Sequence, residues 1–147
     1  MRSINTAGLA LIEQFEGLKF EAYLCPAGVW TIGYGHTRGV HPGMVMTKEQ
    51  AQQALQDDLL TAEGAVESAV GDAATTDNRF AAMVSLCYNI GAANFRTSTV
   101  LRDHRAGNYP AAGEAFLSWN KIAKGGVLQP SLGLTNRRNA ERALYMS

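Results

Sequence analysis

Hydrophobic residues recur at helical spacing along most of this 147-residue chain. The apolar side chains of residues 6–16 fall on one side of a helix, which Gly17 is expected to end. A longer amphipathic segment over residues 48–69 begins with a capping-box pattern and predicts a helix of roughly 30 Å. Asp77 is expected to cap a further helix, and others are expected to begin at Ser98 and Pro110. A last helix is expected over residues 134–146, after a break at Gly125-Gly126.

Residues 18–36 carry a different pattern, which predicts a β-hairpin. Its second strand alternates large and small side chains, so that one face carries Trp30, Ile32 and Tyr34 and the other carries Thr31, Gly33 and Gly35. The first face can pack, and the nearly bare second face is expected to lie open to a ligand. Residues 37–46 are expected to form a loop or a short third strand.

These elements predict an α+β fold in which strands and helices are segregated. A small N-terminal lobe carries the hairpin, a long helix links the lobes, and the C-terminal lobe is helical. A chain of this length is expected to form one domain over residues 1–147, with lobes at about 1–60 and 61–147.

The net charge of the chain limits which binding partners are expected. The 13 basic and 13 acidic residues cancel, which excludes a strongly basic nucleic-acid binder on total charge. The halves differ, however, because residues 1–74 have a net charge of −5 and residues 75–147 a net charge of +5. Part of the second half, Arg137, Arg138 and Arg142, predicts a basic patch on the last helix, with a solvated helix face as the alternative. A basic half can attract an anionic polymer.

The two cysteines, Cys25 and Cys87, are too few for a disulfide scaffold, and no spacing of Cys and His suggests a metal site. Cys87 is expected in the core, and a disulfide between the two is not expected. No segment resembles a signal peptide or a membrane anchor, so we expect synthesis in the cytoplasm. We expect no cofactor and no metal, and a monomer.

Glu16 is the first candidate for chemistry. It falls in the last turn of the first predicted helix, where the negative end of the helix dipole disfavours a second negative charge. Partial burial would add to this effect and favour the protonated acid that proton donation requires. Taken alone, a glutamate at a helix end is more often a solvated surface residue.

The segment from Glu16 to His36 resembles the phage-type lysozyme family of endolysins. Glu16, Cys25 and Thr31 match the family pattern of Glu, eight residues, Asp or Cys, five residues and Thr, and the sequence continues Thr-Ile-Gly-Tyr-Gly-His as in the family. Matching motifs continue toward the C-terminus, in Tyr88-Asn89-Ile90-Gly91, Phe95, Ser98-Thr99, Phe116-Leu117-Ser118-Trp119 and residues 133–138. Several ordered motifs at matching spacing are far more specific than one short pattern.

The resemblance implies a lysozyme-like fold and cleavage of the β-1,4 bond between N-acetylmuramic acid and N-acetylglucosamine in peptidoglycan. Glu16 corresponds to the general acid. Cys25 stands where many members have Asp and acts with Thr31 on the opposite side of the sugar, as a nucleophile or as a pair that positions water. His36, Asn89 and Arg137 correspond to substrate-binding positions.

His36 is expected near the cleft floor without an acid or base role, Asn89 to contact a substrate amide, and Arg137 to pair with the catalytic glutamate. The resemblance also implies a holin that releases the enzyme from the host cytoplasm to the cell wall in the periplasm, where the host is lysed. We expect no nucleic acid partner and no membrane anchor.

Two other functions compete with the lysozyme. One is a cysteine hydrolase that uses Cys25 with His36 or His104, although the proline after Cys25 removes the backbone N–H that usually assists a nucleophilic thiol. The other is an inactive glycan-binding module on the same fold. A neutral thiol is a poor base at pH 7, so Cys25 is also open to a packing role in the hairpin.

Overall fold

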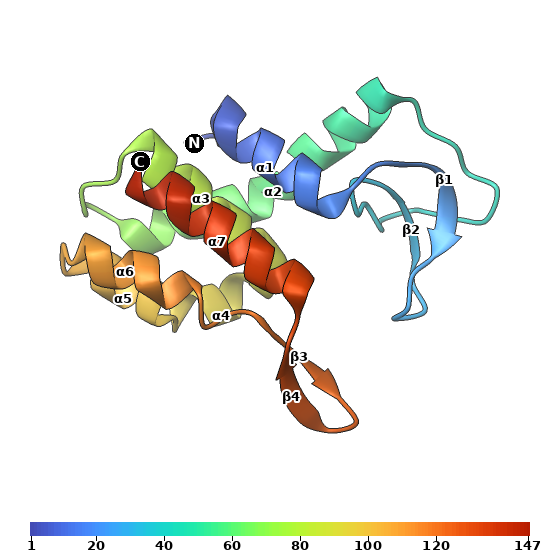
Figure 1. The fold of residues 1–147 in the computed structure, drawn as a ribbon. Helices are drawn as coiled ribbons and strands as arrows, with labels where there is room; N and C mark the ends of the chain where they lie inside the picture. The colour runs from blue at the N-terminus through green and yellow to red at the C-terminus, as the bar shows by residue number, and fades with distance from the viewer. The chain divides into compact units, whose positions relative to one another are not determined.

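The computed structural model describes residues 1–147 as seven helices and two antiparallel hairpins (Figure 1). This arrangement is the α+β fold with segregated strands and helices that the sequence predicts. The chain forms two compact units, residues 12–61 and residues 1–11 with 62–147. Helix α1 (Thr6–Glu16) and helix α2 (Lys48–Val70) each contribute residues to both units.

The hairpin unit is built around strands β1 (Lys19–Leu24) and β2 (Trp30–Gly33). Tyr23 pairs with Thr31 and Leu24 with Trp30, and the register shifts between Lys19 and Tyr23. The connecting turn is closed by the backbone N–H of Cys25, which donates to the carbonyl of Val29 at 3.0 Å. Residues 37–46 form a loop that meets β1 in one bridge, between Glu21 and Val45.

Both faces of β2 are buried, so the expectation of an open, glycine-bearing face is wrong. Ile32 is fully buried and Thr31 is only 5% exposed. A Cβ atom built on Gly33 would lie 3.2 Å from the Cβ of Ala51, so the missing side chain lets α2 approach the strand. Glycine at position 33 therefore allows α2 to pack closely against β2.

The helical unit is centred on α3 (Asp77–Ile90), in which every residue from Phe80 to Cys87 is buried. Helix α3 packs along α7 (Leu132–Met146), and Figure 1 shows the two side by side. Three short helices complete the unit: α4 (Ala92–Arg96), α5 (Thr99–Arg105) and α6 (Tyr109–Phe116). The cap of α3 is Thr76 and not Asp77, because the Thr76 hydroxyl accepts the N–H of Arg79 at 3.1 Å.

A second hairpin, β3 (Lys121–Lys124) and β4 (Val127–Pro130), replaces the simple break expected at Gly125-Gly126. The two glycines form its turn with φ values of +58° and +80°, a conformation that favours glycine. All eight strand residues are exposed, so these strands lack the alternation of apolar and polar residues by which a half-buried strand is predicted from sequence.

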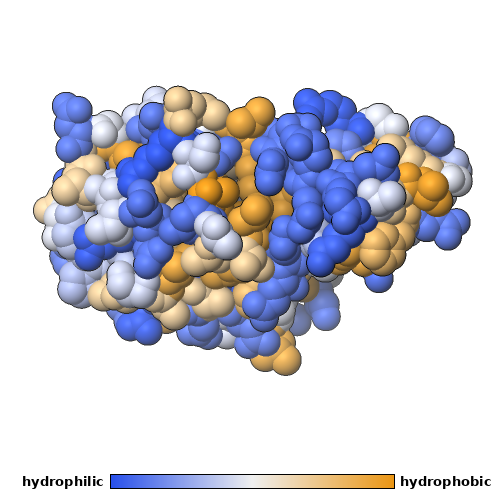
Figure 2. Space-filling view, turned by 90° about the horizontal axis from the view of Figure 1, so that it is seen from above, coloured by the Kyte–Doolittle hydropathy of each residue, from blue (hydrophilic) through white to orange (hydrophobic).

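The surface carries polar and apolar residues together. On the face shown in Figure 2, hydrophilic residues predominate and hydrophobic residues form smaller groups between them. Scattered apolar side chains of this kind are normal on a globular protein. None of the helices combines the length and the hydropathy that crossing a bilayer requires.

Candidate active site

Glu16 lies at the C-terminal end of α1, and its carboxylate reaches the turn that follows β2. Gly17 ends the helix with a φ of +73°, and its N–H donates to the carbonyl of Glu13 at 3.0 Å. A Cβ atom built on Gly35 would stand 2.8 Å from Oε1 of Glu16. The Glu16 carboxylate therefore occupies the space that any side chain at position 35 would need.

The turn that carries Gly35 is held by two sets of hydrogen bonds. Ile32 and His36 exchange backbone hydrogen bonds of 2.9 Å in both directions. The His36 ring lies half-buried with Nδ1 2.7 Å from Oδ2 of Asp58 on α2, and Arg38 approaches the other Asp58 oxygen at 3.4 Å. His36, predicted to bind substrate, is thus tied to Asp58 in a position that fixes the Gly35 turn.

Cys25 and Thr31 lie on either side of the β1–β2 turn. The Thr31 hydroxyl donates to the carbonyl of Val29 at 3.0 Å. Hydrogen bonding from the Val29 backbone lowers the pKa of the Cys25 thiol, partial burial opposes this, and the Ala27 backbone and the Thr31 side chain lower it further. The thiol is therefore more easily ionised than an ordinary cysteine, which increases its capacity as a nucleophile or base.

Both cysteines are free thiols, and their environments differ. Cys87 is buried on α3, as predicted for a core residue, and burial raises its pKa to about 11. Cys25 is partly exposed at the turn. Only Cys25 therefore combines access to solvent with a lowered pKa.

The helical unit brings the other predicted residues together at a buried carboxylate. Arg137 and Arg138 lie on α7, and Glu141 lies between them with N–O distances of 3.3 and 2.8 Å. Ser85 of α3 donates to Glu141 Oε2 at 2.5 Å. Burial raises the pKa of Glu141, and the two arginines oppose that rise.

The prediction of a basic patch at Arg137, Arg138 and Arg142 is wrong. Arg137 and Arg138 are 4% and 0% exposed, and both pair with Glu141. Arg142 pairs with Glu114. The spacing of Glu141, three and four residues after the two arginines, is the sequence signal for this cluster.

Asn89, predicted to contact a substrate amide, stands exposed near the end of α3. Its Oδ1 accepts a hydrogen bond from Nη2 of Arg138 at 2.9 Å. This bond orients the side chain so that the amide NH₂ remains a donor for a ligand carbonyl. Arg138, predicted only as part of a basic patch, therefore supports Asn89.

The predicted residues thus fall into two groups, one in each unit. Glu16, Cys25, Thr31 and His36 belong to the hairpin unit, and Asn89 and Arg137 belong to the helical unit. The hairpin unit offers an acid and a thiol–hydroxyl pair, which are groups for proton transfer and nucleophilic attack. No group of three or more His, Cys, Asp or Glu side chains is placed to hold a metal ion.

Known proteins resemble this chain along nearly its whole length. A family model described as phage lysozyme matches residues 13–141. An endolysin of Acyrthosiphon pisum secondary endosymbiont phage 1 is 40% identical over 144 residues, which cover 98% of each chain. The muramidase domain of SpmX from Asticaccaulis excentricus has a TM-score of 0.94 at 37% identity and covers 100% of this chain and 99% of its own. A P22 lysozyme mutant has a TM-score of 0.87 at 38% identity and covers 100% of both chains.

Proposed function

Because this chain belongs to the phage lysozyme family, it is a glycoside hydrolase of the lysozyme type, and we propose that it hydrolyses the β-1,4 bond between N-acetylmuramic acid and N-acetylglucosamine. The substrate is bacterial peptidoglycan, and its cleavage lyses the cell. The observation that carries the proposal is the position of the Glu16 carboxylate, which fills the space where a side chain on Gly35 would lie. This position places an acid beside the glycine turn of the hairpin.

Glu16 acts in this proposal as the general acid. It protonates the glycosidic oxygen as the bond to the anomeric carbon breaks, so that the sugar leaves as a neutral alcohol. The half-buried position of Glu16 beside the Gly35 turn supports this role, because it holds the carboxyl group in a defined place next to the hairpin.

Cys25 and Thr31 act on the opposite face of the sugar. Thr31 directs its hydroxyl proton to Val29, which leaves the oxygen lone pairs to accept a hydrogen bond from an attacking water. The lowered pKa of Cys25 supports a second role for the pair, direct attack by the thiolate. Held water inverts the anomeric centre, and a covalent thioglycoside followed by hydrolysis retains it.

The remaining predicted residues hold the substrate. Asn89 is proposed to donate its amide to a substrate carbonyl, and Arg137 to belong to the substrate-binding residues that the family resemblance implies. His36 supports the site through Asp58. We further propose that the single domain acts as a monomer and that a holin, implied by the family resemblance, gives it access to the wall in the periplasm.

Reducing-sugar release from purified peptidoglycan tests the assignment of Glu16. Glu16→Gln should abolish release because an amide has no proton of suitable acidity to donate. Glu13→Gln is the matched control, since Glu13 lies one turn earlier on α1 and is also half-buried. Turnover by Glu16→Gln at the rate of the control would refute the acid role.

The same assay separates the other two functions. New free amines without new reducing ends from the wild type would indicate a cysteine hydrolase that uses Cys25. Binding to peptidoglycan without either product would indicate a glycan-binding module. Reducing ends from the wild type and from Glu13→Gln, but not from Glu16→Gln, would establish the glycosidase and its acid.

A further inference from the structure

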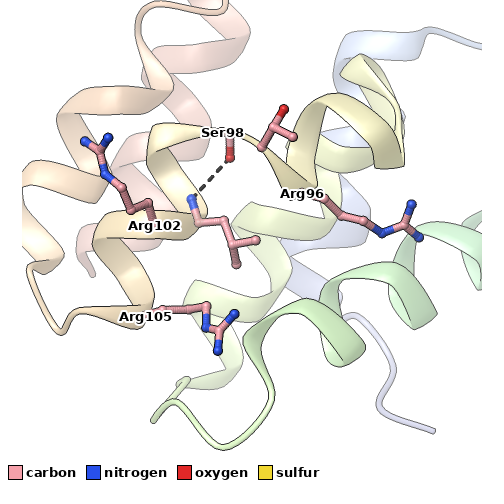
Figure 3. A pocket seen from close by; sticks show the side chains of 6 residues that line it. Arg96, Ser98, Arg102 and Arg105 are labelled. Carbon is pink, nitrogen blue, oxygen red and sulfur yellow. Dashed lines mark hydrogen bonds between the residues drawn. The ribbon is translucent and has the colours of Figure 1, made fainter.

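A basic pocket lies in the helical unit, on helices α4 and α5. Its volume is about 340 Å³, and it is lined by Arg96, Thr97, Ser98, Leu101, Arg102 and Arg105. Figure 3 shows the three arginines around the pocket and Ser98 engaged with the backbone of α5. No acidic residue contributes to the lining. The pocket therefore presents a positive potential to solvent.

Two of these arginines differ from all others in the chain. Seven of the nine arginines face a carboxylate or an aromatic ring, for example Arg38 at Asp58, Arg79 over Tyr109 and Arg142 at Glu114. Arg96 and Arg105 are exposed and make no ion pair or ring contact in the structure. Their charges are left for an external anion.

The third arginine is only partly neutralised. Nε of Arg102 lies 3.6 Å from Oδ1 of the half-buried Asp103, a contact too long for a strong hydrogen bond. Arg102 is otherwise largely exposed and keeps donors for a ligand. The pocket therefore gathers three guanidinium groups against one neighbouring carboxylate.

The directions of the side chains select the kind of anion. In Figure 3 the guanidinium groups of Arg96, Arg102 and Arg105 lie apart from one another, with Arg102 extending away from the other two. A single small anion does not contact all three groups, whereas a polymer with repeated charges can meet each in turn. Leu101 supplies an apolar floor and Thr97 a hydroxyl, which suit the carbons and hydroxyls of a polyol or sugar.

We propose that this pocket binds a phosphorylated polyol or sugar polymer of the bacterial envelope. Arginine forks match phosphate oxygens with paired hydrogen bonds, and successive phosphates along such a polymer can reach separate arginines. The envelope as the source of the polymer rests on the proposed function, because that is where the substrate lies. Binding there would hold the enzyme at the wall independently of the glycan bond that it cleaves.

Fluorescence anisotropy with two labelled probes tests the proposal. Comparing the two probes identifies which envelope polymer the pocket prefers. One probe is lipid-free poly(glycerol phosphate) and the other is delipidated lipopolysaccharide. Arg96→Gln/Arg105→Gln should weaken binding of the preferred probe by about tenfold or more, because each change removes charged hydrogen bonds to phosphate. Lys121→Gln/Lys124→Gln is the matched control, because it removes two exposed charges from the same unit.

Three results would overturn the proposal. They are binding of neither probe by the wild type, equal weakening in the two double variants, and binding of polyglutamate as strong as that of the phosphate polymers. Thermal unfolding of each variant checks whether the fold is retained. Cleavage of soluble peptidoglycan fragments that carry no phosphorylated polymer should be unchanged in Arg96→Gln/Arg105→Gln. This assay distinguishes a failure of the binding proposal from a failure of the proposed glycosidase function.

Discussion

The carboxylate of Glu16 occupies the place of the side chain that Gly35 lacks. A Cβ at position 35 would stand 2.8 Å from Oε1 of Glu16, closer than real Cβ atoms approach other atoms. Gly35 also has a φ of +82°, which residues with a side chain rarely adopt. The glycine therefore has two separable roles, one in the backbone and one in positioning the acid.

Gly35→Ala should lower activity on peptidoglycan by about 100-fold, because a shift of the acid by about 1 Å has effects of that size. Gly39→Ala is the control, since Gly39 has a φ of +71° and nothing within 4 Å of a built Cβ. Both variants should lose about 1 kcal/mol of unfolding free energy from backbone strain. Equal activity in the two variants, measured as kcat beside Tm, would contradict the positioning role.

Substitutions at Cys25 distinguish the two chemistries of the thiol–hydroxyl pair. If Thr31 and Cys25 hold a water, Cys25→Asp should remain active and Cys25→Ser should keep a near-normal rate, with an inverted anomeric product. If the thiolate attacks, Cys25→Ser should lose most of its rate, because a hydroxyl is far less ionised at pH 7. Product anomers followed by NMR, beside the rates, decide between the two. Thr31→Val should lower the rate in either case.

Local patterns predicted most elements of the fold. The first helix was expected over residues 6–16 and is found at Thr6–Glu16, because apolar spacing and Gly17 both mark it. The β3–β4 hairpin was missed because its strands are exposed on both faces and leave no alternating pattern of burial. Residues 1–11 group with the helical unit, and such long-range packing has no local sequence signal.

The candidate site was predicted in part, and for physical reasons. The spacing of Glu16, Cys25 and Thr31 is short-range and can be read along the chain. The pairing of His36 with Asp58 joins residues 22 positions apart, and that of Ser85 with Glu141 joins residues 56 apart. A single sequence carries no information on which distant polar residues meet, so the contact of Ser85 with Glu141 beside Arg137 and Arg138 was not predicted.

His104 should make the stability of the fold depend on pH. Burial, with a smaller effect of Arg79, lowers its pKa to about 4, and its ring nitrogens lie 2.7 Å from Tyr145 Oη and 2.8 Å from Thr75 Oγ1. The unfolded chain, in which the pKa of histidine is about 6.5, then binds the proton more readily. Stability should therefore fall as pH drops from about 6.5 to about 4, by at most about 1.4 kcal/mol per pH unit from this residue.

Urea unfolding at pH 7 and pH 5 measures this dependence. His104→Gln should be less stable at pH 7, because the glutamine does not reproduce both hydrogen bonds, and should lose less stability between the two pH values. His41→Gln, at an exposed histidine, should keep the pH dependence of the wild type. The assignment fails if His104→Gln and the wild type lose the same stability between pH 7 and pH 5.

Glu141 is the carboxylate on which two buried arginines depend. Glu141→Gln should destabilise the fold by about 3 kcal/mol, because it removes the carboxylate that pairs with the fully buried Arg138. Glu114→Gln removes the same charge from the exposed pair with Arg142 and should cost less than about 1 kcal/mol. Urea unfolding of the two variants tests the difference. Similar losses would mean that the buried carboxylate contributes no more to stability than a surface ion pair does.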